Sequence, residues 1–224
     1  MIWQPERLWE GQDAFIIGGG ASLRKFDFNL LKGRNTIGCN DAFRLGEDII
    51  KACIFGDASW FHRTKFDLLK FKNPIFTCAP SLMPLQMKEI IHLHRCRSGL
   101  HPGNGVGWNF STGAAAVNLA INMGARRVFL LGIDLMLVGG KSHWHDLRPH
   151  PTRGDIFNRF LKGFQAIANS LREPQFSHVQ VLHVCEGQSP LPFFEKVTLE
   201  HLPRMLNPCL VGVMVEGQPM EVVP

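Results

Sequence analysis

The chain has 224 residues, 45% of them hydrophobic, and a formal net charge of +5 with histidine neutral. This length and apolar content suit one domain, expected over residues 1–209, with residues 210–224 as a tail or an edge strand. The basic residues are scattered with no run of five or more, so no nucleic-acid-binding arm is indicated. A small molecule that carries a phosphate suits such a surface equally well.

The N-terminal residues lack the pattern of a signal peptide, and no apolar stretch approaches the roughly 20 residues of a membrane span. The six cysteines form no CxxC pair and show no close Cys/His spacing. We therefore expect reduced cysteines in the core of a cytoplasmic protein. The sequence leaves the oligomeric state open, a homo-oligomer included.

The first predicted element is an apolar strand at 14–18, which runs into three glycines and a serine: Gly18, Gly19, Gly20 and Ser22. Glycine permits a sharp turn and close approach of a ligand, and Ser22 is a candidate helix cap. A helix N-terminus at this point would offer free N–H groups to an anion such as phosphate. The glycines match neither the full dinucleotide fingerprint nor the P-loop, so a plain strand-to-helix turn is the alternative.

Further elements alternate along the chain. Expected strands lie at 36–38, 52–55, 74–78, 90–93, 127–131 and 179–184, and expected helices at 111–123, 156–171 and 198–205. Ser111 or Thr112 is expected to cap the first of these helices, and Phe157 and Phe160 belong to the apolar face of the second. The alternation predicts an α/β, single-domain, Rossmann-like fold with a mostly parallel sheet flanked by helices.

Polar residues follow most of the expected strands. Asn40 and Asp41 follow the strand at 36–38, Asp57 follows the strand at 52–55, and Asp134 follows the strand at 127–131. Taken singly, each is also compatible with a helix cap or a turn. Ligands of open parallel sheets bind beyond the carboxyl ends of the strands, so the clustering predicts a binding site there.

His143 and His145 flank Trp144, so in an extended segment both imidazoles point to the same face. The pair is compatible with a general base or phosphate donor, with a solvated loop, or with a metal site completed by Asp146 or His150. We adopt the first interpretation and assign no resident metal ion.

The chain resembles two related protein groups in the order and rough spacing of four motifs: Ile17–Leu23, Ile37–Asp41, Ser111–Gly113 and Val128–Asp134. The chain resembles bacterial CMP-sialic-acid-dependent sialyltransferases of glycosyltransferase family 42. It also resembles the MptE-like group, which includes 6-hydroxymethylpterin diphosphokinases and is similar to Maf flagellin glycosyltransferases. Uncharacterised phage and prophage proteins share the glycine turn and the His-Trp-His motif. The similarity extends over residues 13–202.

The sialyltransferase resemblance implies a set of nucleotide contacts: Gly18, Gly19, Ser22, Asn40, Ser111, Thr112 and Gly113. It places Asp134 nearby and makes His143 or His145 the candidate base. Those enzymes use tyrosines on the donor phosphate, and this chain contains no tyrosine. A histidine, Lys141 or Arg153 is therefore expected in that role.

The resulting hypothesis is a glycosyltransferase with a nucleotide-sugar donor, CMP-linked by resemblance, and an unknown acceptor. His143, His145 and Asp134 are the candidate catalytic residues. We add three residues to those expected to bind the donor: Gly20, Asp41 and Asp57. Asp57 is expected to orient hydroxyls of the sugar or the base. One alternative is a diphosphokinase-like transferase whose Mg²⁺ is held by Asp57 and Asp134. Another is a phage protein that binds a nucleotide without catalysis.

Overall fold

The computed structural model describes residues 6–147 and 152–206. Its main sheet contains β1 (Asp13–Ile17), β2 (Asn35–Cys39), β3 (Ala52–Phe55), β4 (Ile75–Thr77), β5 (Ile90–His92), β8 (Arg127–Leu131), β9 (Gln180–Val184) and β10 (Glu195–Val197). A second, two-stranded sheet pairs β6 (His94–Cys96) with β7 (Gly105–Gly107). The α-helices are α1 (Ala58–Leu68), α2 (Thr112–Asn122), α3 (Gly154–Ser170) and α4 (Leu202–Leu206). Four 3₁₀ helices complete the set: η1 (Ala21–Lys25), η2 (Phe28–Leu31), η3 (Asn40–Leu45) and η4 (Pro80–Leu85).

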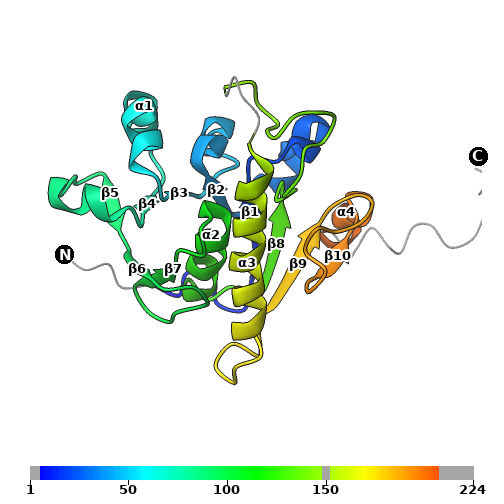
Figure 1. Ribbon diagram of the computed structural model, residues 1–224. Helices are drawn as coiled ribbons and strands as arrows, with labels where there is room; N and C mark the ends of the chain where they lie inside the picture. The colour runs from blue at the N-terminus through cyan, green and yellow to red at the C-terminus, as the bar shows by residue number, and fades with distance from the viewer. Residues whose placement is uncertain (1–5, 148–151, 207–224) are drawn as a thin grey trace, which may run out of the picture.

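All pairings in the main sheet are parallel, in the order β10-β9-β8-β1-β2-β3-β4-β5 (Figure 1). The chain builds β1 to β5 outward in one direction and then returns to add β8 to β10 on the other side of β1. The strand order therefore reverses between β1 and β8. Such a reversal opens a crevice at the carboxyl ends of the strands.

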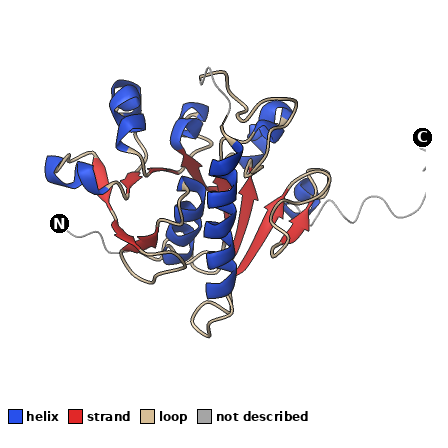
Figure 2. Ribbon diagram, in the orientation of Figure 1, coloured by secondary structure: helices blue, strands red, loops and turns tan. Residues whose placement is uncertain are grey.

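Helices cover both faces of the sheet (Figure 2). Successive strand residues point to opposite faces, so in β1 Ala14 and Ile16 pack with α2 and α3, whereas Phe15 and Ile17 pack with α1, α4 and the 3₁₀ helices. Burial on both faces explains why the central strands are uninterrupted apolar runs. The predicted fold class, a single α/β domain with a parallel sheet, is confirmed.

Some local expectations are wrong. The chain after β1 forms the five-residue 3₁₀ helix η1, whose N-cap is Gly20, so Ser22 does not cap an α-helix. The sequence analysis did not predict α1, β6, β7 or β10. The last helix begins at Leu202 rather than at residue 198. The strands among these, His-Arg-Cys, Gly-Val-Gly and Glu-Lys-Val, lack the apolar run by which the equally short β4 and β5 were predicted.

Two further predictions concern the cysteines and the C-terminal residues. Cys39, Cys53, Cys78, Cys96 and Cys185 are free, as predicted, and Cys209 lies outside the described residues. The expected tail or edge strand at 210–224 also lies outside them. Across the described ranges, no helix combines the length and the apolar character needed to cross a bilayer.

Candidate functional site

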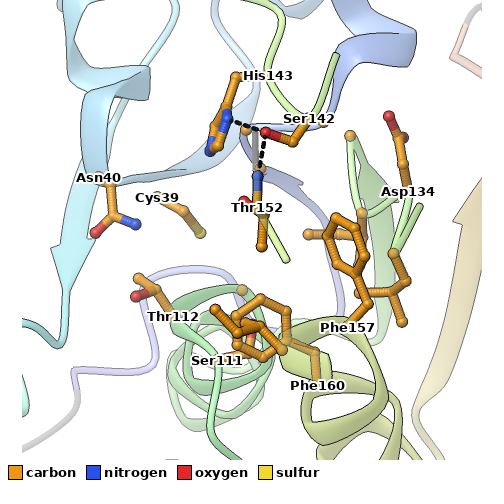
Figure 3. Close-up of a pocket in the computed structure, with 18 of the residues that line it drawn as sticks. Cys39, Asn40, Ser111, Thr112, Asp134, Ser142, His143, Thr152, Phe157 and Phe160 are labelled. Carbon is orange, nitrogen blue, oxygen red and sulfur yellow. Dashed lines mark hydrogen bonds between the residues drawn. The ribbon is translucent and has the colours of Figure 1, made fainter. Parts of the chain in front are cut away.

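A cavity of about 550 Å³ lies where β8, β1, β2 and β3 end, at the reversal of the strand order. The starts of α2 and α3 and the loop that carries the two histidines complete its walls (Figure 3). Of the predicted site residues, all but Ser22 line the cavity: Gly18, Gly19, Gly20, Asn40, Asp41, Asp57, Ser111, Thr112, Gly113, Asp134, His143 and His145. The cavity has the volume typical of small-molecule sites.

The glycine turn is shaped by its protein neighbours. A Cβ at Gly18 would lie 2.5 Å from the carbonyl oxygen of Gly132, and one at Gly20 would lie 2.5 Å from Cγ of Asp134. Both distances are too short for any side chain, so the β8 exit packs directly on the backbone of the turn. Glycine is needed here for contact within the protein as much as for access of a ligand.

Asp134 holds this turn through Ser22. The Ser22 amide donates to Oδ2 of Asp134 at 2.9 Å, and the Ser22 hydroxyl donates to Oδ1 at 2.6 Å. The amide of Gly20 donates to the carbonyl of Gly132 at 2.8 Å. At the expected helix start, the amides of Gly20 and Ser22 are therefore taken by acceptors within the protein. Within the described part of the chain, the amides of Gly19 and Ala21 remain without an acceptor.

The two histidines lie side by side, as the alternating pattern predicts. Their ring centroids are 5.2 Å apart and the rings are tilted by 34°. Trp144, between them, binds the glycine turn: its backbone amide donates to Gly19 O at 2.9 Å and its Nε1 donates to Gly18 O at 3.0 Å. Trp144 thus fixes the loop so that both imidazoles line the cavity.

Hydrogen bonds orient the His143 ring. Its Nδ1 lies 2.7 Å from the hydroxyl oxygen of Ser142, and that oxygen accepts the Thr152 amide at 2.9 Å (Figure 3). With Nδ1 held by Ser142, proton exchange with a molecule in the cavity would take place at Nε2.

His145 has a different arrangement. The Leu147 amide donates to its Nδ1 at 3.4 Å, so in the neutral ring the proton is on Nε2. Nε2 faces Oδ2 of Asp41 at 3.9 Å, and both side chains are less than 10% exposed. Asp41 also accepts from Nε1 of Trp60 at 3.0 Å. The Asp41 carboxylate therefore bonds to Trp60 and lies close to His145, although the sequence analysis assigned it to the ligand.

Asn40 is the most unusual polar residue of the site. Its φ of 52° is left-handed, a conformation that Asn tolerates better than most residues. Its Oδ1 is buried and has no hydrogen-bond partner among the described residues. A buried acceptor without a donor costs about 1–3 kcal/mol. A ligand that donates a hydrogen bond to Asn40 would remove this cost.

The start of α2 faces the cavity. Ser111 is the N-cap, as predicted, but its hydroxyl makes no capping hydrogen bond. The first amides of an α-helix have no partner within the helix, and here no side chain of the N-cap replaces one. Ser111, Thr112 and Gly113 all line the cavity. This helix start, rather than the glycine turn, is the stronger candidate anion site.

Most charged side chains around the cavity form hydrogen bonds or ion pairs with other protein groups. Burial acts to raise the pKa of Asp57, but hydrogen bonds from Ser59 outweigh it and hold the pKa below its ordinary value. The Asp57 carboxylate accepts the Ser59 amide at 2.8 Å and so caps α1. Both candidate cations are paired with carboxylates, Arg153 with Asp155 at 3.0 Å and Lys141 with Asp146 at 3.3 Å, but only Arg153 is among the described residues that line the cavity. The expectation that Lys141 serves the ligand is therefore not met.

The metal alternative finds no support in these residues. Hydrogen bonds from Arg24 and Lys141 hold the pKa of Asp146 below its ordinary value, and His150 lies outside the described residues. Over the described ranges, no three His, Cys, Asp or Glu side chains are grouped to hold a metal ion. Cys39 also lines the cavity, but burial raises the pKa of its thiol to about 12, so it stays protonated.

The sequence analysis missed the aromatic part of the site. Trp60, Trp108 and Phe110 line the cavity, and so do Phe157 and Phe160, which were assigned to the helix core. Phe157 and Phe160 lie at the start of α3, opposite His143 and Asn40 (Figure 3). Their helical spacing predicts a buried face but does not distinguish a packed core from the wall of a cavity.

The comparisons with known proteins concern the fold. No protein-family model matches the chain, and no curated protein matches it in sequence. The structure is similar to that of the sialyltransferase CstII from Campylobacter jejuni in complex with cytidine-5'-monophosphate. The TM-score is 0.53 at 16% identity, over 84% of this chain and 85% of that one. A second CstII structure, with CMP-3FNeuAc, gives a TM-score of 0.50 at 14% identity, over 83% and 85%. At these identities the likeness shows a shared fold.

Proposed function

We propose that the protein is a glycosyltransferase that uses a nucleotide-sugar donor. The observation that carries the proposal is the cavity at the strand reversal, where a pair of oriented histidines and the open start of α2 line the same space. The CstII fold supports it, because two structures of that fold hold CMP or a CMP-sugar analogue. The resemblance to MptE-like and phage proteins stays a prediction.

Each part of the site has a role in this proposal. The amides at the start of α2 bind the donor phosphate, and Arg153 stabilises the negative charge of the leaving nucleotide. The Oδ1 of Asn40 accepts a hydrogen bond from a hydroxyl or amino group of the donor. Asp134 and Ser22 keep the glycine turn in place, so Asp134 acts by positioning rather than in the chemical step.

His143 is the proposed base. Its Nε2 takes the proton of the acceptor hydroxyl while the acceptor oxygen forms a bond to the anomeric carbon of the donor. The bond between that carbon and the phosphate oxygen breaks, and its electron pair leaves with the nucleotide. The contact with Ser142 keeps the ring oriented for this transfer. His145 carries its proton toward Asp41 and is less suited to remove another.

The geometry favours the alternatives less. A diphosphokinase-like reaction would need Asp57 and Asp134 as Mg²⁺ ligands. The Asp57 carboxylate already caps α1, and both oxygens of Asp134 accept from Ser22. A protein that binds a nucleotide without catalysis would use the same cavity, so only a catalytic test separates it from the transferase.

The first prediction concerns binding. CMP, UDP, GDP and ADP at millimolar concentration are compared by thermal shift, because a ligand of the native state raises Tm by mass action. We expect one nucleotide, CMP first, to raise Tm. A Gly113→Val substitution, which adds a branched side chain beside Ile133 at the start of α2, should abolish the shift. If no nucleotide changes Tm or binds by calorimetry, the proposed function is wrong.

A His143→Ala variant tests catalysis with the nucleotide-sugar selected by binding. We expect the rate of nucleotide release to fall by about 10²- to 10⁴-fold, the contribution of a general base, with nucleotide affinity retained. His94→Ala is the control, because His94 is exposed on β6, outside the cavity lining. Equal, measurable rates for wild type and His143→Ala would exclude His143 as the base, whereas no nucleotide release above background in the wild type would favour a binding protein.

A further inference from the structure

Trp108 is a cavity-lining side chain that the proposed reaction does not use. It lies against Gly56, the residue that follows β3. A Cβ at Gly56 would be 1.8 Å from Cζ3 and 2.3 Å from Cη2 of the indole. Every residue other than glycine at position 56 would displace the ring. The end of β3 is therefore shaped to receive the Trp108 indole at the border of the cavity.

Arg95 fixes the indole from a second direction. Its Nε donates to the carbonyl of Cys78 and its Nη2 to the carbonyl of Gly56, both at 2.6 Å. The guanidinium lies 4.1 Å from the centroid of the Trp108 ring. These bonds tie Arg95 to the ends of β3 and β4, so the indole is held by a cation that cannot swing away.

The backbone after Trp108 is strained. Asn109 has φ 50° and Phe110 has φ 60°, and a left-handed conformation is a genuine outlier for a bulky residue such as Phe. The Asn109 side chain stabilises the segment by donating to Gly99 O and Gly107 O and by accepting the Gly99 amide. Strain that the surroundings enforce in this way is typical of functional sites.

We propose that Trp108 is the stacking residue for the nucleobase of the ligand and that Arg95 is its positioning residue. The inference rests on the proposed function, because the ligand is taken to be a nucleotide. The proposed function places the phosphate at the start of α2 and a donor hydroxyl or amino group at Asn40, whereas Trp108 is a half-buried aromatic side chain in the cavity wall at the exit of β3. The Arg95 charge withdraws electron density from the indole, which favours a neutral flat ring over a cation.

The test compares ligands with and without a base. Binding of CMP and of ribose 5-phosphate is measured by calorimetry for wild type, Trp108→Ala and Trp108→Phe. Loss of one base stack weakens binding by about 5- to 150-fold, so we expect Trp108→Ala to lose CMP affinity by that factor. Ribose 5-phosphate affinity should stay constant in all three proteins. Trp108→Phe, which keeps a smaller aromatic face, should fall between wild type and Trp108→Ala and guards against loss of folding.

Tryptophan fluorescence supplies a second measurement. CMP should quench emission of the wild type and of a control, Trp9→Phe, whose missing ring is buried in the core. The quenching should weaken in Trp108→Phe, in which Trp60 is the tryptophan that still lines the cavity. Arg95→Met should make Trp108 more accessible to acrylamide. It should also weaken the binding of CMP but leave the binding of ribose 5-phosphate unchanged.

The outcomes distinguish a wrong stacking role from a wrong proposed function. Two results would show that the stacking role is wrong while the proposed function stands. In the first, wild type and Trp108→Ala bind CMP equally well. In the second, Trp108→Ala loses affinity for ribose 5-phosphate to the same extent as for CMP. If the wild type binds no nucleotide among CMP, UDP, GDP and ADP, the proposed function fails and the stacking role fails with it.

Discussion

Two hydrogen bonds from Ser22 to the Asp134 carboxylate connect the glycine turn to the end of β8. Asp134 is only 9% exposed, so replacing an acceptor oxygen with a donor leaves a Ser22 group unpaired away from water. We predict that Asp134→Asn lowers the free energy of unfolding by about 1–3 kcal/mol and Ser22→Ala by about 1 kcal/mol. Urea denaturation of both variants and of their combination measures the coupling.

The double variant should lose less than the sum of the two single variants, since both remove the same contact. Ser177→Ala is the matched control, because its exposed hydroxyl donates to the nearby Pro174 carbonyl. Strict additivity at positions 22 and 134 would show that the two residues do not act together.

At the level of elements, α3 packs directly on the strained segment that carries Trp108 and Phe110. A Cβ at Gly163, in the interior of α3, would lie 1.9 Å from the backbone oxygen of Asn109. Glycine to alanine inside a helix ordinarily stabilises by about 1 kcal/mol. We predict the opposite sign for Gly163→Ala, a loss of about 1–3 kcal/mol from overpacking, measured by urea denaturation.

Gly154→Ala in the same helix is the control. Gly154 is the first residue of α3, and a Cβ there would meet nothing within 4 Å. Its effect should stay within about 0.5 kcal/mol. A stabilising Gly163→Ala would mean that α3 and the Asn109 segment are further apart than described.

For the molecule as a whole, a buried histidine in the sheet makes stability depend on pH. His183 in β9 is fully buried with Nδ1 beside the Ser189 hydroxyl, and burial lowers its pKa to about 4. The unfolded chain takes up this proton near pH 6.5, but the native state does so only near pH 4. Acid therefore favours the unfolded state, and stability falls as pH drops through that window.

The contribution of His183 is about 3 kcal/mol at most between pH 6.5 and pH 4. Urea denaturation across this range should show a smaller loss of stability for His183→Gln than for wild type. Identical slopes in the two proteins would show that the native state accommodates the charged ring. His201→Gln, at an exposed position before α4, is the control.

The secondary structure around β1, β3, β8 and α2 could be predicted because it depends on local patterns. The apolar run at 52–55 coincides with β3, and the run at 127–131 coincides with β8. The position of the cavity was also predictable, because parallel strands bring their carboxyl ends to one edge. Asn40, Asp57 and Asp134 follow from this rule, whereas His143 came from the alternation around Trp144 and from the family resemblance.

The partners of these residues could not be predicted. Ser22 is 112 residues from Asp134 in the chain, His145 reaches Asp41 across the cavity, and Trp108 lies on Gly56. A serine after a glycine turn looks like a helix cap when read locally, but the carboxylate brought by β8 takes its amide and its hydroxyl.

The sequence by itself therefore determined the layered fold and the edge of the sheet at which the polar residues gather. These features arise from periodic burial and from short-range backbone preferences, which each segment carries within itself. Only the tertiary structure decided which amides and carboxylates remain available to a ligand and which serve the protein. Hydrogen-bond partners depend on distances between segments far apart in the chain, and those distances exist only once the sheet has assembled.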